Sequence, residues 1–231
     1  MIPVFIVWLI RRYKQNQKKN KVVSSAIRKQ KKFRVQPTTI LIIAGLLASI
    51  KSNSQNKLLN YQIVRNGNKV GTLRFSETNS AGMDCLKMES DVKTRFIFTF
   101  IAHASEEAIY YNGVLLRSSI YRLLNGNEKA NKQHQAENRR YIIHKGQDTE
   151  VSDIFPITYN MLSLYSREPG SINKVYSDNF ETYVAIQQPE PHKYKITLPD
   201  GNYNFYYYKN GVLSQIDVHH SLYSANIILT N

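Results

Sequence analysis

Cysteine is almost missing from this chain of 231 residues, which carries Cys85 alone. A lone cysteine cannot close an intramolecular disulfide, and it cannot supply a zinc site built from several thiolates. Cys85 also lies far downstream of the apolar N-terminal stretch, so it is not placed like the acylated cysteine of a lipoprotein. We expect it to be a buried strand residue in a fold that depends on its hydrophobic core.

Acidic residues are absent from positions 1–54, which hold 12 of the 31 Lys and Arg residues. Positions 55–231 hold the other 19 basic residues and all 17 acidic ones, so their net charge is only +2 although the whole chain has +14. Phosphate backbones are bound through a basic groove. The nearly neutral body therefore argues against a nucleic-acid partner, and the excess charge belongs to the N-terminal segment.

Motifs of catalysis are missing as well. The chain has no P-loop, no G-x-G-x-x-G, no G-x-S-x-G and no H-E-x-x-H. His219 and His220 are adjacent and would point to opposite faces of a strand, whereas His103 shares a face with Glu107 but has no second histidine at a ligand spacing. An enzyme would need such residues to converge with others such as Asp217 in a polar cleft. The sequence itself indicates no catalytic or metal-binding residue and no cofactor.

The N-terminal segment has the layout of an export signal. The apolar stretch Ile40–Ile50 follows a basic run, and Ser52 and Ser54 are small residues at positions −3 and −1 of a cleavage site before Gln55. A membrane span needs about 18 or more apolar residues. Residues 35–54 are therefore interpreted as a signal peptide, with an N-terminal membrane anchor as the alternative. The expected location is periplasmic or secreted, and membrane contact is expected only through this segment if it is not cleaved.

Residues 1–34 fit that layout less well, because Met1–Ile10 is a second apolar piece and a polar, basic run follows it. We expect that translation starts near Lys31–Val35, so that residues 1–34 are a basic extension assigned to the protein through a start codon placed too early. The alternative is a cytoplasmic extension that binds anionic lipid or nucleic acid through its charge. Residues 55–231 are ample for one hydrophobic core and tight for two, so we expect a single β-rich domain there.

Two-residue turns punctuate this domain. Asparagine or aspartate followed by glycine tolerates the positive φ angles of type I′ hairpin turns. Alternating apolar residues flank these steps, as in Leu59, Tyr61 and Ile63 before the first and Val212, Ser214, Ile216 and Val218 after the last. The pattern predicts an all-β, mainly antiparallel fold, either a strongly curved sheet or an open β-barrel. The five steps are Asn66-Gly67, Asn112-Gly113, Asn125-Gly126, Asp200-Gly201 and Asn210-Gly211, with Lys145-Gly146 as a weaker sixth.

One segment has helical rather than strand periodicity. Ile157, Met161, Leu164 and Tyr165 recur at i, i+4, i+7 and i+8. Pro156 would occupy the first helical position, and a second proline follows the stripe. We predict one short helix near residues 157–167 that packs on the sheet.

Two stripes of aromatic residues are the most informative feature of the sequence for a binding function. Phe96, Phe98 and Phe100 share one strand face, and Tyr203, Phe205 and Tyr207 share another, with Tyr206 and Tyr208 opposite. Strands with large residues on both faces either are covered on both sides or line a space without water. These two stripes are our candidate ligand-binding residues, for an apolar or amphipathic ligand such as a lipid. The alternative is that one stripe is core and the outward tyrosines are half-exposed.

The succession of these pieces resembles the domain of unknown function 6134 family, a group of exported bacterial β-rich proteins, over essentially all of residues 56–231. That resemblance implies a signal peptide, one β-rich domain and no established activity or catalytic residues. The pieces are Tyr61 and Ile63 with Asn66-Gly67, Val70–Leu73, Glu89 with Asp91–Phe96, Tyr111–Leu115, Ile157–Tyr159 with Glu168-Pro169, Leu198–Gly201 and Tyr207–Gly211.

Two functional hypotheses follow. The first is an exported, non-enzymatic envelope protein that holds an apolar or amphipathic ligand in its curved sheet, and it predicts a cavity lined by the phenylalanine stripe. The second is a structural or protein-protein interaction module of the envelope without a small-molecule ligand. It predicts a filled interior and an exposed aromatic patch.

Overall fold

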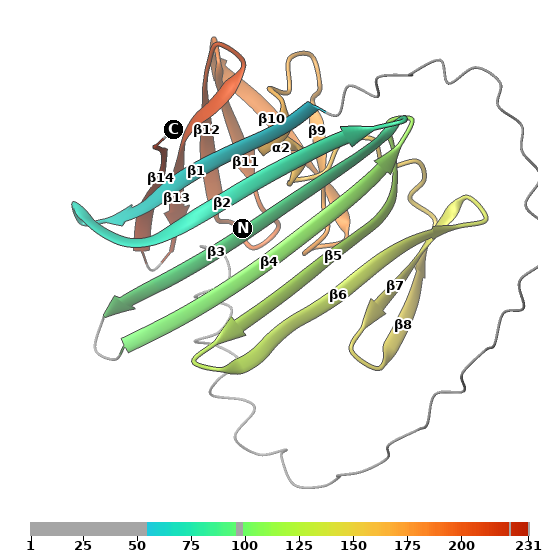
Figure 1. Ribbon diagram of the computed structural model, residues 1–231, viewed down its shortest axis with the longest axis horizontal. Helices are drawn as coiled ribbons and strands as arrows, with labels where there is room; N and C mark the ends of the chain where they lie inside the picture. The colour runs from blue at the N-terminus through green and yellow to red at the C-terminus, as the bar shows by residue number, and fades with distance from the viewer. Residues whose placement is uncertain (1–54, 96–98, 222, 231) are drawn as a thin grey trace, which may run out of the picture.

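The computed structural model describes residues 55–95, 99–221 and 223–230, and they form one antiparallel sheet of 14 strands (Figure 1). Among the described residues there is one helix, α2 (Ser163–Ser166), and it is four residues long. The strands are β1 (Gln55–Arg65), β2 (Asn68–Ser80), β3 (Met83–Arg95), β4 (Thr99–Tyr111), β5 (Val114–Leu124), β6 (Asn127–Glu137), β7 (Arg140–Lys145), β8 (Asp148–Ser152), β9 (Lys174–Ser177), β10 (Thr182–Glu190), β11 (Lys193–Thr197), β12 (Tyr203–Lys209), β13 (Val212–His220) and β14 (Tyr223–Leu229).

Sequential hairpins build almost the whole sheet. Its spatial order is β8-β7-β6-β5-β4-β3-β2-β1-β14-β13-β12-β11-β10-β9, so only the β1–β14 pair joins strands that are distant in the chain. Figure 1 shows β1–β6 as a broad layer of long strands, with the strands from β9 to β14 curling behind it. The sheet is strongly curved and does not close, because β8 and β9 remain its two edges. The predicted fold class is confirmed.

The predicted turns occur where strands meet, although one of them has a different geometry. Asn66 and Gly67 have φ angles of 49° and 75°, and both residues of the other three Asn-Gly steps also have positive φ angles, as type I′ turns require. At Asp200-Gly201 only the glycine has a positive φ, of 84°. The Leu198 amide donates to the Asn202 carbonyl across this longer connection, so the two-residue turn predicted there is wrong.

Side-chain alternation sorts the strands into an inner and an outer face. Leu59, Tyr61 and Ile63 of β1 are buried on the inner face, as predicted. The predicted alternation fails at the start of β13, where Leu213 is buried and Val212 and Ser214 are only partly so. The β12–β13 register shifts between Tyr207 and Tyr208, which leaves one extra residue on β13 and reverses the faces before it.

A segment that leaves the sheet fills its concave side. This inner segment, residues 153–181, contains α2 and β9 and runs between β8 and β10. The short helix expected near residues 157–167 is present as α2, but it spans four residues, so its predicted extent is wrong. The backbone of the segment instead bonds to the sheet, since the Leu115 amide donates to the Ile157 carbonyl and the Met161 amide to the Tyr176 carbonyl. Its buried apolar residues are Ile157, Tyr159, Met161, Leu162, Leu164, Tyr165, Val175 and Tyr176.

The last turn of the inner segment connects the two ends of the open sheet. This closing turn, residues 178–181, meets β5, β6 and β7 through side chains. Lys132 Nζ donates to the Asn179 carbonyl at 2.8 Å and to Glu181 Oε1 at 2.5 Å, and Lys145 Nζ lies 2.6 Å from Glu181 Oε2. Polar side chains thus replace the ladder of backbone hydrogen bonds that would close a barrel.

Candidate functional site

The predicted phenylalanine stripe does not mark a described cavity. Phe96 and Phe98 lie outside the described residues, and Phe100 is partly buried and packs against the hydrophobic core. The cavity between the inner segment and the sheet, bordered by Met88, Glu106 and Tyr206, has a volume of about 10 Å³. That is room for about one water molecule, not for an acyl chain.

The second predicted stripe lies on the outer face of the sheet. Tyr203, Phe205 and Tyr207 are each half-buried there, whereas Asn204, Tyr206 and Tyr208 point inward and are buried. The alternation that set these two groups apart in the sequence is therefore confirmed. The outward stripe makes a surface, not the lining of the interior.

Two lysines of the neighbouring strand β11 pack on these outward rings. Lys193 Nζ lies 5.1 Å from the ring centroid of Phe205 and 5.6 Å from that of Tyr207, and Lys195 Nζ lies 4.7 Å from that of Tyr203. Such contacts are favourable because the ring face carries the negative end of the aromatic quadrupole. We call Lys193, Lys195, Tyr203, Phe205, Tyr207 and His219 the aromatic face.

The rings of the aromatic face also contact one another. His219 stacks on Tyr203 with centroids 4.7 Å apart and an interplanar angle of 14°. Tyr203 meets Phe205 edge to face at 5.7 Å and 83°. Since Lys195 and His219 already pack on the Tyr203 ring, a flat ligand would have little free ring surface to stack on at this position.

Asp217 is the acidic residue within this surface. Its Oδ1 accepts hydrogen bonds from Gln215 Nε2 at 2.6 Å and from Asn226 Nδ2 at 2.7 Å. Burial, together with a hydrogen bond to Asp217, raises the pKa of Tyr207 to about 12. Asp217 is therefore held in place by donors of its own sheet, and its carboxylate acts on the hydroxyl of Tyr207.

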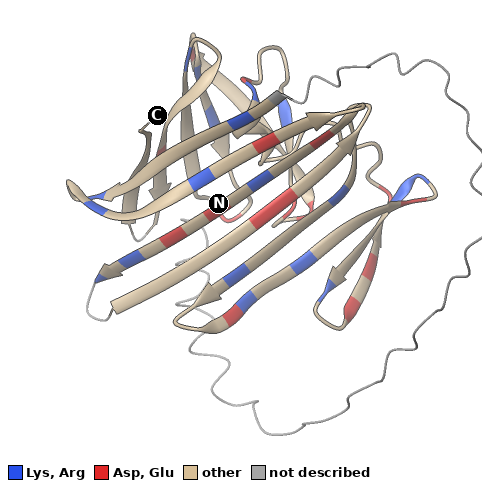
Figure 2. Ribbon diagram, in the orientation of Figure 1, with Lys and Arg blue, Asp and Glu red and all other residues tan. Residues whose placement is uncertain are grey.

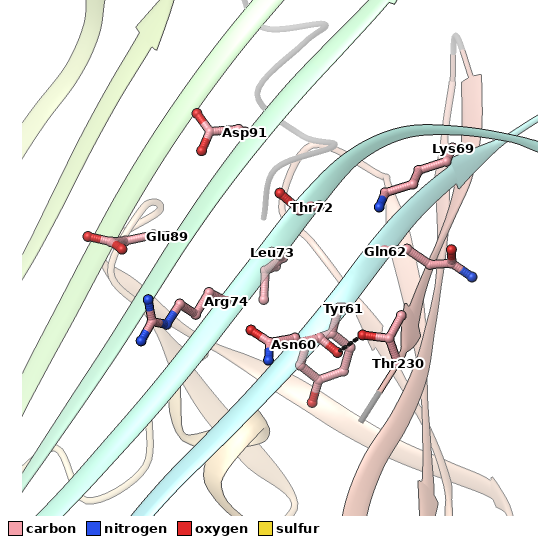
Figure 3. Close-up of a pocket in the computed structure, with 10 residues that line it drawn as sticks. All are labelled: Asn60, Tyr61, Gln62, Lys69, Thr72, Leu73, Arg74, Glu89, Asp91 and Thr230. Carbon is pink, nitrogen blue, oxygen red and sulfur yellow. Dashed lines mark hydrogen bonds between the residues drawn. The ribbon is translucent and has the colours of Figure 1, made fainter.

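A second outer feature is a groove of about 430 Å³ on β1, β2 and β3. Figure 3 shows Lys69, Thr72 and Arg74 along β2, with Glu89 and Asp91 beside them on β3. The volume falls in the usual range for small-molecule sites. Its lysine and arginine are matched by two carboxylates, so the groove offers hydrogen bonds without a preferred charge. The other residues of the groove are Asn60, Tyr61, Gln62, Leu73 and Thr230.

Figure 2 shows residues of both signs on β2, β3 and β6, acidic residues on β4 and basic residues on β5. Lys87 Nζ lies 2.7 Å from Glu89 Oε1, His103 Nδ1 2.9 Å from Asp91 Oδ1, and Arg117 3.5 Å from Glu107. The charges on this part of the outer face therefore compensate one another.

Sequence reasoning missed a buried polar network beneath the inner segment. Arg122 donates to Glu106 Oε1 at 2.6 Å although both side chains are almost fully buried, at 2% and 3% exposure. Ser118 Oγ donates to Asp178 Oδ1 at 2.5 Å, and Asn160 Nδ2 donates to Asp178 Oδ2 at 2.9 Å. The sequence does contain a signal for this pair. Glu106 lies in phase with Ala104 and Ala108 of β4, and Arg122 lies in phase with Ile120 and Leu124 of β5, which places both on the inner face.

Two members of this region have strongly shifted pKa values. Burial, with the nearby Glu106 carboxylate adding to it, raises the pKa of Asp178 from 3.8 to about 6. Burial lowers the pKa of His134 from 6.5 to about 4, and the two ring nitrogens of this fully buried residue have no hydrogen-bond partner in the described part of the chain. Both groups are buried where the inner segment meets the sheet, so they act on the stability of the fold.

The residues considered for catalysis are held by other partners. His103 pairs with Asp91, Glu107 with Arg117, and Asp217 with Gln215 and Asn226, so no polar cleft brings them together. Burial raises the pKa of the Cys85 thiol, which disfavours the reactive thiolate. Among the described residues there is no group of three histidine, cysteine or acidic side chains arranged to bind a metal. The same residues include no helix with the length and hydropathy of a membrane span.

Comparisons with known proteins give a structure of similar fold and a matching protein family. A crystal structure titled as a beta-barrel-like protein of domain of unknown function DUF1849, from Brucella abortus, superposes with a TM-score of 0.51 at 9% sequence identity, covering 75% of this chain and 95% of that one. At that identity the likeness concerns the fold alone. No curated protein matches the chain. The family model of the domain of unknown function DUF6134 matches residues 61–230, nearly the entire sheet, and the chain belongs to this family.

Proposed function

We propose that the protein is an exported, non-enzymatic component of the cell envelope that binds its partner on the aromatic face. The observation that carries this proposal is the placement of Tyr203, Phe205 and Tyr207, half-exposed on the outside of a sheet whose concave side is filled by its own chain. Export is inferred from the signal-like residues 35–54 and is tested by sequencing the N-terminus of the protein recovered from the envelope fraction. We expect it to begin at Gln55.

The inner segment is the reason for preferring the outer face over the interior. An apolar ligand in the curved sheet would have to replace side chains such as Leu164 and Tyr165, which are 0% and 7% exposed. Each buried side chain of this size is worth about 1.5–3 kcal/mol, and the closing turn adds its polar contacts. Carriage of a ligand inside therefore requires the whole segment to leave, whereas binding outside requires no rearrangement.

Site-specific photocrosslinking tests the surface. A photoreactive phenylalanine at position 205 is expected to give a discrete crosslinked product in intact cells, and the same group at Gln133 on the outer face of β6 is not. Equal products at both positions, or none at either, would count against the aromatic face. Native mass spectrometry of the detergent-free protein decides the interior alternative, because a reproducible extra mass that extracts as lipid and survives Phe205→Ser would locate the ligand inside.

A further inference from the structure

The groove of about 430 Å³ on β1, β2 and β3 is lined by two rows of polar side chains that cross all three strands. Residues directly opposite each other on one face of a sheet have Cβ atoms about 4.5–5.5 Å apart. Each row is therefore a continuous line of side chains, and one ligand can contact the three strands at once. The register partners are Asn60, Arg74 and Glu89 in one row and Gln62, Thr72 and Asp91 in the other.

A bulge in β2 brings a further polar side chain into the groove. The β1–β2 register shifts between Ile63 and Val64, and β2 has one extra residue, Val70, at this point. An extra residue reverses the alternation of side chains, so Lys69 points to the same outer face as Thr72 (Figure 3). Bulges are frequent next to functional sites because they redirect a side chain in this way. The redirected lysine makes the groove longer than the two rows alone.

The groove offers polar groups that the fold itself does not use. Within the described part of the chain, no hydrogen bond or ion pair holds the side chains of Gln62, Thr72 and Arg74. Arg74 is the register partner of Glu89, yet Glu89 pairs with Lys87 of its own strand at 2.7 Å. That contact uses one carboxylate oxygen, Oε1. A ligand can therefore bond to these groups without breaking a contact of the sheet.

Charge and hydrogen-bonding capacity together favour a neutral ligand with several hydroxyl groups. Lys69 and Arg74 are balanced by Glu89 and Asp91, so the groove does not select an anion or a cation. The two cations only donate hydrogen bonds and the two carboxylates only accept them. A hydroxyl group does both, so a chain of hydroxyls can bond to either kind of group in turn. A zwitterion would also match both signs, but its own charges would first have to give up their water.

The length of the groove favours a chain of sugar rings over a single one. Lys69 and Arg74 are five residues apart on β2, which corresponds to about 15 Å along a strand. A single sugar ring does not reach from one to the other, whereas a short oligosaccharide does. The volume falls within the range of small-molecule sites.

We propose that the groove binds a neutral oligosaccharide, with the side chains of β1 and β2 donating to its oxygens and the carboxylates of β3 accepting from its hydroxyls. This site lies on other strands than the aromatic face, so the inference goes beyond the proposed function and does not depend on it. The ring of Tyr61 is 1% exposed and its hydroxyl donates to the Leu213 carbonyl, so it offers no surface for a sugar to stack on. Binding through hydrogen bonds that compete with water is weak, and we expect a dissociation constant on the order of 1 mM.

Saturation-transfer difference NMR of the full chain, as recovered from the envelope, tests the groove because this method detects weak ligands. The probes are maltotetraose and chitotetraose. We expect transfer to at least one of them, at low and at high salt alike, since a neutral ligand is not screened. Absence of transfer to both tetrasaccharides would overturn the proposal.

A matched pair of variants locates the binding. Thr72→Lys fills the floor of the groove from an exposed position and is expected to weaken tetrasaccharide binding at least about tenfold. Thr78→Lys is the control, because it makes the same substitution on the same face of β2, about 20 Å away. We expect it to change binding less than about twofold. Equal loss in both variants would also overturn the proposal.

A third variant separates recognition of hydroxyls from recognition of charge. Arg74→Gln/Glu89→Gln keeps a donor and an acceptor in the groove but removes both charges, so tetrasaccharide binding should fall less than about fivefold. Triglycine serves as the zwitterionic probe. Transfer to triglycine instead of the tetrasaccharides, lost in this variant and at high salt, would refute the saccharide ligand. Crosslinking at position 205 reports on the aromatic face separately, so either proposal can fail while the other stands.

Discussion

Replacing His134 by phenylalanine should change how the stability of the protein depends on pH. His134 is fully buried, and its ring meets that of Tyr176 edge to face at 5.9 Å. Burial disfavours its charged form, whereas the carboxylate of Glu181 opposes this and Lys132 and Lys145 reinforce it, so its pKa lies at about 4. Phenylalanine keeps the ring contact and removes two buried nitrogen atoms that have no partner within the described residues.

The sign follows from the two pKa values of this histidine. In the unfolded chain it takes up a proton as pH falls through 6.5, and in the folded protein it does so only near 4. Its contribution to stability is therefore present above pH 6.5 and is lost as pH falls from 6.5 to 4. At pH 5 the loss relative to pH 8 amounts to about 2 kcal/mol. The His134→Phe variant should not show this loss.

Asp178 contributes with the opposite sign over nearly the same range. Its folded pKa of about 6 lies above its ordinary value of 3.8. Its contribution is therefore complete below pH 3.8 and is lost as pH rises through 6, so that acidification to pH 5 stabilises the fold by about 1 kcal/mol. The two groups partly cancel in the wild type, and each single variant reveals the other. Asp178→Asn, which keeps an acceptor for Asn160, should lose stability more steeply with acid than the wild type.

Urea denaturation at pH 8, 6 and 5 measures these differences. Relative to the wild type, His134→Phe should gain about 2 kcal/mol between pH 8 and pH 5, and Asp178→Asn should lose about 1 kcal/mol over the same interval. Other carboxylates affect all three proteins equally and drop out of the comparison. The reasoning fails if the curve of His134→Phe runs parallel to that of the wild type, because the histidine would then titrate normally in the folded state.

Three further substitutions test the packing of the sheet, with the free energy of unfolding as the measurement. Gly71→Ala would place a Cβ 2.3 Å from the Asp91 carbonyl oxygen, and we expect a loss of about 1–3 kcal/mol; unchanged stability would mean that β2 and β3 are not so close there. Arg122→Met should cost about 3–5 kcal/mol because it leaves the Glu106 carboxylate buried without its cation, and Glu106→Leu/Arg122→Met should recover most of that. Glu181→Gln should cost about 2 kcal/mol, and no loss would indicate that its lysine contacts do not close the sheet.

The sequence predicts the local features of this fold well. Hairpins need only neighbouring residues, and the positive φ angles of Asn66-Gly67 are a property of those two residue types. The same local logic fails where a distant partner decides. The stripe around Met161 looks helical, but its backbone bonds to Tyr176 keep the preceding residues extended. The bulge beside Ser214 is likewise invisible in the sequence, because it depends on the register of β12.

The sequence groups Tyr203, Phe205 and Tyr207 on one face of a strand, but it does not give the direction in which that face points. Alternation separates Tyr203, Phe205 and Tyr207 from Tyr206 and Tyr208, yet both groups are aromatic, so composition alone does not say which one faces inward. The structure resolves this through hydrogen bonds of the inner group, such as that from the Tyr208 hydroxyl to the Leu164 carbonyl at 2.8 Å. A buried tyrosine needs such a partner.

The edges of the sheet give an independent reason to look for a partner on the outer face. An unpaired edge strand invites a further strand, and proteins guard against this with charge or cover. At one edge, β9 is covered by the part of the inner segment that precedes it, since Asn160 forms a parallel bridge with Tyr176. At the other, β8 is short and exposes Asp148 and Glu150. With both described edges guarded and the concave side filled, a partner that added a strand or entered the sheet would have to disrupt existing contacts. One that binds the aromatic face would disrupt none.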